Sequence, residues 1–427
     1  MKISPDRSKG VRPALRYGLY PWTIVYLIVA VFSLGALPAT YVLGTEGFYR
    51  ILQSIDNDYI FNAYVWTVLS CLLLYFLFAV SGGQKNLKAF VLKTIELKSQ
   101  DYYRRLWMIT FILSMLITGW MFFKTGYRLP IREALGLDFV ASMQLRQAYE
   151  TQLNQSIFNI QLYGLGIFNC AIVMFGLKRR RLWYSMLSAV NIVLICAFSL
   201  AKSPIANFLL IMAILYTLVK PIPFTRVILI PVLFISLVWP LYTVSGILEN
   251  MEQTFISAVA ERILYGQWIS LPFYFEIFRD ISQPYGSVLP PYVQSACMGH
   301  GYEWGESPSR MVMREIVGDV AVDQGGAGVA TTFFIGEAYA LGGAAGIIGA
   351  ILLVAFEAWL LSFLFLKIKK TIFSTFLLAF MLFKLCIGII SGISVFVLSG
   401  FTFVLFALAV WVYLSYISTM PGYESSQ

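Results

Sequence analysis

Ten mostly apolar stretches divide this chain of 427 residues, and they constrain its fold more than any other feature. A bilayer core about 30 Å thick is crossed by about 20 apolar residues in helical form, so each stretch can span a membrane. A spanning segment must satisfy its own backbone hydrogen bonds, which favours helices. The sequence therefore predicts an all-α, polytopic membrane protein that forms one membrane domain over residues 1–427. The predicted spans are Trp22–Leu43, Ile60–Val80, Leu106–Phe123, Ile157–Leu177, Leu182–Leu200, Pro204–Val219, Val227–Val244, Leu341–Leu366, Phe373–Ile390 and Phe401–Ile417.

The composition agrees with a surface that faces lipid. Hydrophobic residues make up 59% of the chain and charged residues only 12%, whereas soluble domains carry about 25% charged residues. The formal net charge of +9 does not indicate a nucleic-acid partner. The basic residues lie in short connectors and form no stripe interleaved with aromatic residues that would follow phosphates, so we expect no nucleic-acid binding.

The distribution of lysine and arginine predicts the topology. Cytoplasmic connectors carry an excess of basic residues. With the N-terminus inside, the tails 1–17 and 418–427 are cytoplasmic, and the long segment 245–336 between spans seven and eight faces outward. This choice places 20 of the 31 basic residues in short cytoplasmic segments: Lys2, Arg7, Lys9, Arg12, Arg16, Lys85, Lys88, Lys93, Lys98, Arg104, Arg105, Lys178, Arg179, Arg180, Arg181, Lys220, Arg226, Lys367, Lys369 and Lys370.

Several outward-facing cations are not explained by topology. Arginine binds phosphate oxygens in a bidentate manner and keeps its proton, so a set of outer cations predicts a phosphate-binding site. Lys202 adds to this prediction because it precedes Pro204 at a helix start, where free N–H groups favour anions. Each of these residues taken alone could also be a solvated cation or a lipid-headgroup anchor. The candidate phosphate-binding residues are Arg128, Lys202, Arg262, Arg279, Arg310 and Arg314.

The long outer segment contains two predicted helices. Phe255–Phe278 forms an amphipathic pattern that includes Tyr265 and Trp268, with a break expected at Pro272. Ser307–Val320 has a capping serine and a proline at its start, and Arg310 and Arg314 share one face at i, i+4. The aromatic residues either anchor the segment at the membrane interface or stack against sugar rings.

Two residues are candidate proton acceptors. His300 is the single histidine of the chain, and it could take a proton from a hydroxyl group, although a solvent-exposed loop residue is an equally simple interpretation. Glu337, just before span eight, is the alternative base at the membrane surface. Nearby, Gly342 and Gly346 have the spacing of closely packed membrane helices. The chain has no His/Cys cluster for zinc, so no metal and no cofactor are predicted.

The segment Gly325–Gly346 carries a resemblance to a known family. Its pattern, in which Gly336-Glu337-Ala-Tyr339 is followed by Gly343 and Gly346, resembles a stretch in bacterial oligosaccharide repeat-unit polymerases of the O-antigen polymerase type. A Lys202-Ser203 turn before a helix and a large outer segment late in the chain also fit this family, which is related to O-antigen ligases.

The resemblance implies a glycosyltransferase of GT-C-like architecture in the bacterial inner membrane. Such an enzyme transfers a growing glycan from undecaprenyl diphosphate to another lipid-linked repeat unit at the periplasmic face, without a metal ion. By position, Lys202 and Arg262 would bind the diphosphate with help from Arg279, Arg310 or Arg314. His300 or Glu337 would accept the proton, Tyr339 would lie at the substrate, and a chain-length regulator would be a possible protein partner.

Two other functions remain open from the sequence. Asp56-Asn57-Asp58 has the form of an Asp-x-Asp motif, which would suit a metal-dependent glycosyltransferase that uses a lipid-monophosphate sugar. An exporter of lipid-linked oligosaccharides is the other possibility, although few charges lie within the predicted spans and one outer segment dominates.

Overall fold

The structure is a computed structural model of the whole chain. It describes residues 18–36, 52, 54–93, 100–133, 139–178, 182–199, 203–220, 222–223, 266, 268–280, 306–319, 322, 330, 332–392, 406–407, 409–411 and 413–414.

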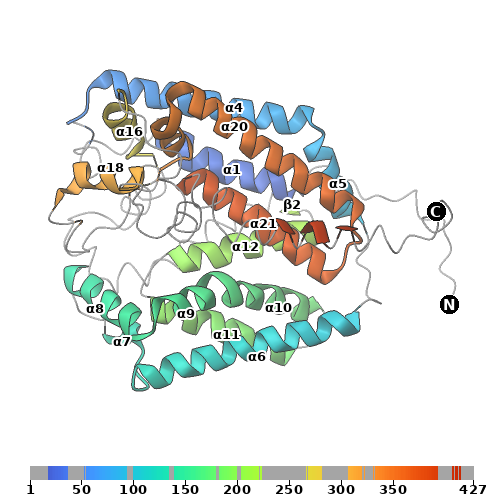
Figure 1. Cartoon of the computed structure of the whole chain (residues 1–427). Helices are drawn as coiled ribbons and strands as arrows, with labels where there is room; N and C mark the ends of the chain where they lie inside the picture. The colour runs from blue at the N-terminus through green and yellow to red at the C-terminus, as the bar shows by residue number, and fades with distance from the viewer. Residues whose placement is uncertain are drawn as a thin grey trace, which may run out of the picture.

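The described chain is helical apart from one pair of two-residue strands (Figure 1). The strands β1 (Gly18–Leu19) and β2 (Ile222–Pro223) pair antiparallel, with Gly18 opposite Pro223. The helices are α1 (Pro21–Leu34), α4 (Asn57–Val80), α5 (Gly83–Leu92), α6 (Gln100–Lys124), α7 (Pro130–Glu133), α8 (Phe139–Gln152), α9 (Gln155–Ile160), the π-helical turn η2 (Gln161–Leu165), α10 (Gly166–Lys178), α11 (Leu182–Ser199), α12 (Ser203–Val219), α16 (Leu271–Ile277), α18 (Pro308–Val317), α20 (Ile335–Lys367) and α21 (Ile372–Ser391).

Six helical segments of the described chain are long and apolar enough to cross a membrane, as expected for an α-helical, multi-pass membrane protein. They are Asn57–Val80, Trp107–Lys124, Ile157–Gly176, Leu182–Ser199, Ile335–Lys367 and Ile372–Ser391. Two shorter apolar helices, Pro21–Leu34 and Pro204–Val219, coincide with two further predicted spans. The predicted span Val227–Val244 lies outside the described residues, and only residues 406–407, 409–411 and 413–414 of the last span are described.

The helices pack around α21, which lies between two groups in Figure 1. One group contains α1, α4, α5 and α20, and the other contains α6, α9, α10 and α11, with α12 beside α21. In the apolar segment of α21, 78% of the residues are buried, whereas in that of α6 only 22% are buried, so α21 lies at the centre of the bundle and α6 at its outside. On α4, Phe61, Leu72 and Phe76 are exposed, which is the pattern of a helix that faces lipid.

The long helix α20 is bent, which corrects two expectations. It begins at Ile335 rather than Leu341, and it is interrupted by non-helical backbone at Gly342 and Gly343, where Gly343 has a φ of 58°. A β-carbon on Gly346 would collide with the backbone carbonyl of Ala338. Gly342 therefore lies in the bend itself, and Gly346 packs against the carbonyl of Ala338 on the other side of the bend. The two glycines do not share one face of a straight helix.

A buried polar network joins α6, η2, α10 and α11. The Ser114 hydroxyl accepts hydrogen bonds from Asn169 Nδ2 and Asn191 Nδ2, both at 2.8 Å. Gln161 Nε2 donates to Thr118 Oγ1 at 2.8 Å, and Thr118 Oγ1 donates to Asn191 Oδ1 at 2.6 Å. All five side chains are buried. Because polar groups find few other partners in hydrocarbon, this network helps to fix how these helices pack.

At one end of the bundle, two lysines cross-connect α5 and α20. Lys93 Nζ donates to the carbonyls of Leu366 and Ile368, and Lys370 Nζ donates to the carbonyl of Val91 at 2.7 Å. Each ammonium group thus satisfies carbonyls at the C-terminus of the other helix, where the helix dipole favours a cation. These connectors are among those predicted to be cytoplasmic, and the strand pair β1–β2 joins two more of them.

Candidate functional site

The candidate site lies at the opposite end of the bundle, where α16, α18, the start of α4 and the start of α20 meet (Figure 1). Helix α16 begins at Leu271 with Pro272 in its first turn, a position that proline favours, and residues 255–265 of the predicted helix lie outside the described chain. Helix α18 begins at Pro308, as the sequence predicts, but the Ser307 side chain makes no capping hydrogen bond.

Trp268 anchors the approach to α16 against α4. Its indole is fully buried, stacks on the Tyr64 ring with centroids 4.1 Å apart, and donates from Nε1 to Thr67 Oγ1 at 3.2 Å. A side chain without exposed surface cannot stack against a sugar ring. In this structure Trp268 therefore fixes α16 in place, and the expected substrate contact is not available to it.

Arg279 and Tyr339 come together at the exposed edge of the site. The guanidinium of Arg279 is exposed and donates from Nη1 to the Tyr59 hydroxyl at 3.2 Å. This hydrogen bond, followed by the charges of Tyr59 and Asp280, raises the pKa of Arg279. Tyr339 lies near enough to contribute to the same shift, and its ring packs on Phe275 at 4.3 Å. The cation is thus held at the surface among aromatic hydroxyl groups.

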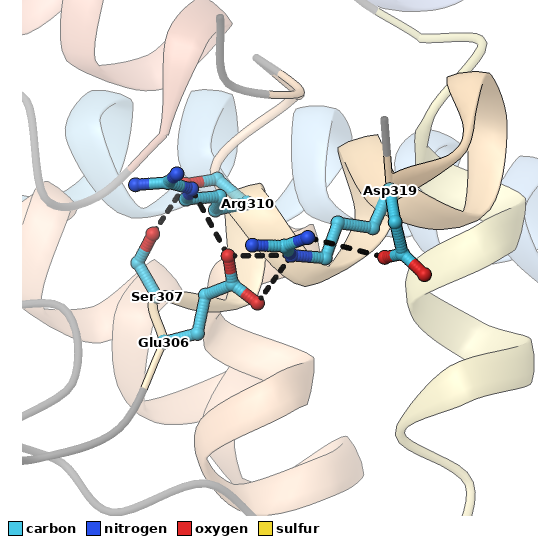
Figure 2. Close-up of polar contacts among 6 residues, drawn as sticks. Glu306, Ser307, Arg310 and Asp319 are labelled. Atoms are coloured by element: carbon cyan, nitrogen blue, oxygen red, sulfur yellow. Dashed lines mark hydrogen bonds and ion pairs between the residues drawn. The ribbon is translucent and has the colours of Figure 1, made fainter. Parts of the chain in front are cut away.

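Arg310 and Arg314 are held by one carboxylate (Figure 2). Arg310 Nε lies 3.0 Å from Glu306 Oε1, and Arg314 Nε contacts both Glu306 oxygens at 2.8 and 2.9 Å. Arg314 Nη1 also donates to Asp319 Oδ1 at 3.1 Å. The two arginines share a face as predicted, but Glu306 and Asp319 offset much of their charge. An anionic ligand would have to share or displace these ion pairs.

Glu337 is buried within the protein. The residue is 4% exposed, and its carboxyl group lies directly over Gly392 at the end of α21. A backbone hydrogen bond of 2.9 Å, donated by Phe334 N to Ile389 O, also joins the start of α20 to the end of α21. Tyr339, two residues further along α20, points to Phe275 instead. The two motif residues therefore occupy different faces of this short helical segment, with Glu337 on the buried one.

The Tyr274 phenol of α16 lies close enough to Glu337 to feel its charge. Burial, with a smaller contribution from the charge of Glu337, raises the pKa of Tyr274 well above its ordinary value. Its hydroxyl donates to the carbonyl of Ala330 at 3.3 Å. A phenol that stays protonated is a hydrogen-bond donor at all physiological pH values.

Acidic side chains also gather at this end. The pKa of Glu276 is raised, first by burial and then by the charges of Glu315 and Asp56. Asp56 is the N-cap of α4, where its Oδ1 accepts from the backbone N–H of Asp58 at 3.3 Å. Within the described ranges, no three His, Cys, Asp or Glu side chains are grouped so that they could hold a metal ion.

Arg128 lies away from the other described candidates. It forms an ion pair with Glu133 at 3.5 Å, and Glu133 also accepts from the Tyr149 hydroxyl at 2.6 Å. These residues belong to α7, α8 and the turn before them, which Figure 1 shows well apart from α16 and α18. Four other candidates, namely Lys202, Arg262, Tyr265 and His300, lie outside the described residues.

Three members of the site were not anticipated. Tyr59, Glu276 and Glu306 orient or surround the predicted arginines, and each lies in a first helical turn, a helix end or a connector. The position of Glu306 four residues before Arg310 was a usable signal, because oppositely charged residues at that spacing can pair. Nothing in the sequence pairs Tyr59 with Arg279, since 220 residues separate them.

The arrangement combines an exposed, oriented guanidinium group with a buried carboxyl group and a phenol on adjoining elements. Such a set could bind an anionic group at the edge and exchange a proton further inside. Comparisons with models of protein families, with curated proteins and with solved structures find no match for this chain.

Proposed function

We propose that this chain is a membrane glycosyltransferase that joins undecaprenyl-diphosphate-linked oligosaccharide repeat units into a surface polysaccharide. The proposal includes ten spans, a GT-C-like architecture, cytoplasmic termini, and a site at the periplasmic face of the inner membrane. The observation that carries it is the exposed guanidinium group of Arg279, which Tyr59 orients by a hydrogen bond beside Tyr339. This group lies at the end of the bundle opposite the end where Lys93 and Lys370 connect α5 and α20. A diphosphate leaving group requires such a fixed cation.

The chemistry would proceed as a direct displacement. An acceptor hydroxyl oxygen forms a bond to the anomeric carbon of the donor sugar, while the bond between that carbon and the diphosphate oxygen breaks. The hydroxyl proton passes to a base, for which Glu337 and His300 are the candidates. The departing diphosphate gains negative charge, which Arg279 would stabilise together with Lys202 and Arg262.

The buried position of Glu337 bears on its role as the base. A carboxyl group beside Gly392 and near Tyr274 is shielded from bulk water. The acceptor hydroxyl would have to enter along α16 to reach it. The two candidate bases therefore differ in this requirement, since His300 belongs to the long outer segment.

Product analysis in cells that lack the protein tests the reaction class. Loss of a polymerase leaves single lipid-linked repeats at the outer face and no long chains. Loss of an exporter leaves the repeats inside, and loss of a ligase leaves finished polymer on its lipid carrier. Either of the last two patterns would contradict the proposal.

Substitutions at Arg279 test the site itself. Arg279→Ala is expected to reduce long-chain product at least tenfold, and Arg279→Lys to restore only part of it, because the lysine ammonium lacks the planar fork. Lys124→Ala is the matched control: it removes an exposed cation at the same end of the bundle, on α6. Product levels in Arg279→Ala equal to those in Lys124→Ala, at equal protein levels in the membrane, would remove Arg279 from the proposed site.

A further inference from the structure

The end of the bundle opposite the candidate site carries a dense set of like charges. Five described segments at this end, residues 18–22, 81–93, 219–220, 222–223 and 366–372, contain no aspartate or glutamate. They do contain seven lysines, which we call the lysine-rich end: Lys85, Lys88, Lys93, Lys220, Lys367, Lys369 and Lys370. Contacts between α5 and α20, and between β1 and β2, bring these segments together.

Two of these lysines, Lys93 and Lys370, connect helices, and four others are exposed on the surface. Lys370 is buried and Lys93 is half-buried, and both donate to backbone carbonyls. Burial, followed by the nearby charge of Lys367, lowers the pKa of Lys93. The repulsion between these ammonium groups shows that they lie close together, and an anion nearby would relieve it. Lys85, Lys88, Lys367 and Lys369 have exposed side chains.

Helix α5 has the form of a helix that lies in a membrane interface. Gly82, with a φ of 76°, separates it from α4 and lets the chain turn. Leu87, Phe90 and Val91 are buried against the bundle, whereas Lys85 and Lys88 are exposed on the other side. A short helix with an apolar face and lysines on its polar face is typical of segments that rest among lipid headgroups.

Exposed apolar side chains adjoin the lysines. Leu92, at the end of α5, is 55% exposed, and Val80, at the end of α4, is 69% exposed. Lys88 also lies over the Tyr20 ring, 5.3 Å from its centroid, and an aromatic ring of this kind commonly lies at headgroup depth. Positive charge beside apolar surface matches a molecule with an anionic head and acyl chains. Free phosphate would gain nothing from Leu92 or Val80.

We propose that the lysine-rich end binds an anionic phospholipid. Lys85 and Lys88 of α5, with Lys367 and Lys369 at the end of α20, contact the phosphate of the headgroup, and the acyl chains lie along Val80 and Leu92. This inference does not depend on the proposed function, since it concerns the other end of the bundle and a different ligand.

The test measures lipid retention by the full-length protein in detergent micelles. Native mass spectrometry counts the bound phosphatidylglycerol molecules during a titration, and phosphatidylcholine with the same acyl chains serves as the neutral comparison. Wild-type protein is expected to retain phosphatidylglycerol in preference. A variant with Lys85→Gln, Lys88→Gln, Lys367→Gln and Lys369→Gln is expected to lose this preference, because each basic residue near the surface is worth about fivefold in binding.

Two controls separate the possible explanations. Lys124→Gln combined with Arg132→Gln removes exposed cations at the other end and is expected to leave the preference intact. Inorganic phosphate, added during the wild-type titration, is expected to displace little lipid. Equal retention of both lipids, an unchanged preference in the fourfold variant, or displacement by millimolar phosphate would each overturn the proposal.

Salt dependence gives a reading that needs no variant. Raising the ionic strength from about 0.1 M to 1 M shortens the Debye length from about 10 Å to about 3 Å. Retention of phosphatidylglycerol by the wild-type protein is expected to fall across this range. If retention is independent of salt, the lysines do not bind the headgroup, whatever the folding state of the fourfold variant.

Discussion

The buried network around Ser114 provides a sharp test of how the membrane helices are held together. In Ser114→Ala the hydroxyl is removed, and with it the acceptor of hydrogen bonds from Asn169 and Asn191 at 2.8 Å and from Gln161 Nε2 at 3.0 Å, and the donor to Gln161 Oε1 at 3.3 Å. Hydrogen bonds between membrane helices contribute about 0.6 kcal/mol on average and rarely more than about 1.7 kcal/mol. A serine hydroxyl can accept two of these bonds and donate one at the same time, which gives roughly 1.8 kcal/mol, and up to about 3 kcal/mol if the amide groups stay buried without a partner.

Ser188 is a matched control for this substitution. It is a fully buried serine on α11, like Ser114 on α6, but its hydroxyl has no hydrogen-bond partner among the described residues. Ser188→Ala removes the same atom without breaking a hydrogen bond, so we expect it to be neutral or slightly stabilising. Comparing the two variants cancels the effect of changing serine to alanine in a helix.

The assay is reversible unfolding in mixed micelles, with the fraction of denaturing detergent as the variable and helix content as the signal. The free energy of unfolding is expected to fall by 1 to 3 kcal/mol, on the estimate above, in Ser114→Ala relative to Ser188→Ala. If the two variants unfold at the same detergent fraction, the network does not stabilise the packing of α6, α10 and α11, and the reasoning is refuted.

Two further predictions concern the candidate site. Gly392→Ala would place a β-carbon 2.8 Å from the Glu337 carboxyl carbon, at a backbone φ of 129°, so we expect a markedly lower melting temperature. Gly349→Ala is the control and should be tolerated, because its β-carbon meets nothing within 4 Å. Equal melting temperatures of the two variants would contradict the close contact. The raised pKa of Glu276 means that the folded state binds its proton more tightly than the unfolded state, so its contribution to stability is present below about pH 4.5 and lost as pH rises through the folded pKa. Glu276→Gln should therefore raise the melting temperature at pH 7 relative to wild type and have little effect at pH 4, and a constant difference across pH would refute this assignment.

The sequence was a good guide to the helices and a poorer one to the polar contacts. Apolar length located the six helical segments that are long enough to cross a membrane and two shorter apolar helices, because each depends mainly on local composition. The start of α18 at Pro308 was also predicted, since proline favours a first helical turn. These features depend on neighbouring residues alone.

The parts that sequence reasoning missed depend on contacts between distant residues. The burial of Trp268 depends on Thr67 and Tyr64 of another helix, and the position of Glu337 depends on Gly392. The bend at Gly343 was missed because glycine in an apolar run is equally compatible with a straight, closely packed helix. Tertiary packing decided among conformations that the local sequence allows equally well.

The bend in α20 divides the helix into two portions, and the rotation of the first portion about the helix axis depends on the second. Its 33 residues would measure about 50 Å if straight, much more than a hydrocarbon core about 30 Å thick. The portion after Gly343 is long enough to cross on its own. The seven residues before the bend, 335–341, form a short terminal segment, which we call the ledge, and its orientation about the helix axis follows from that of the crossing portion. Inserting a single alanine between Gly349 and Lys367 would turn that ledge by about 100°, carrying Glu337 away from Gly392 without altering any residue near either of them.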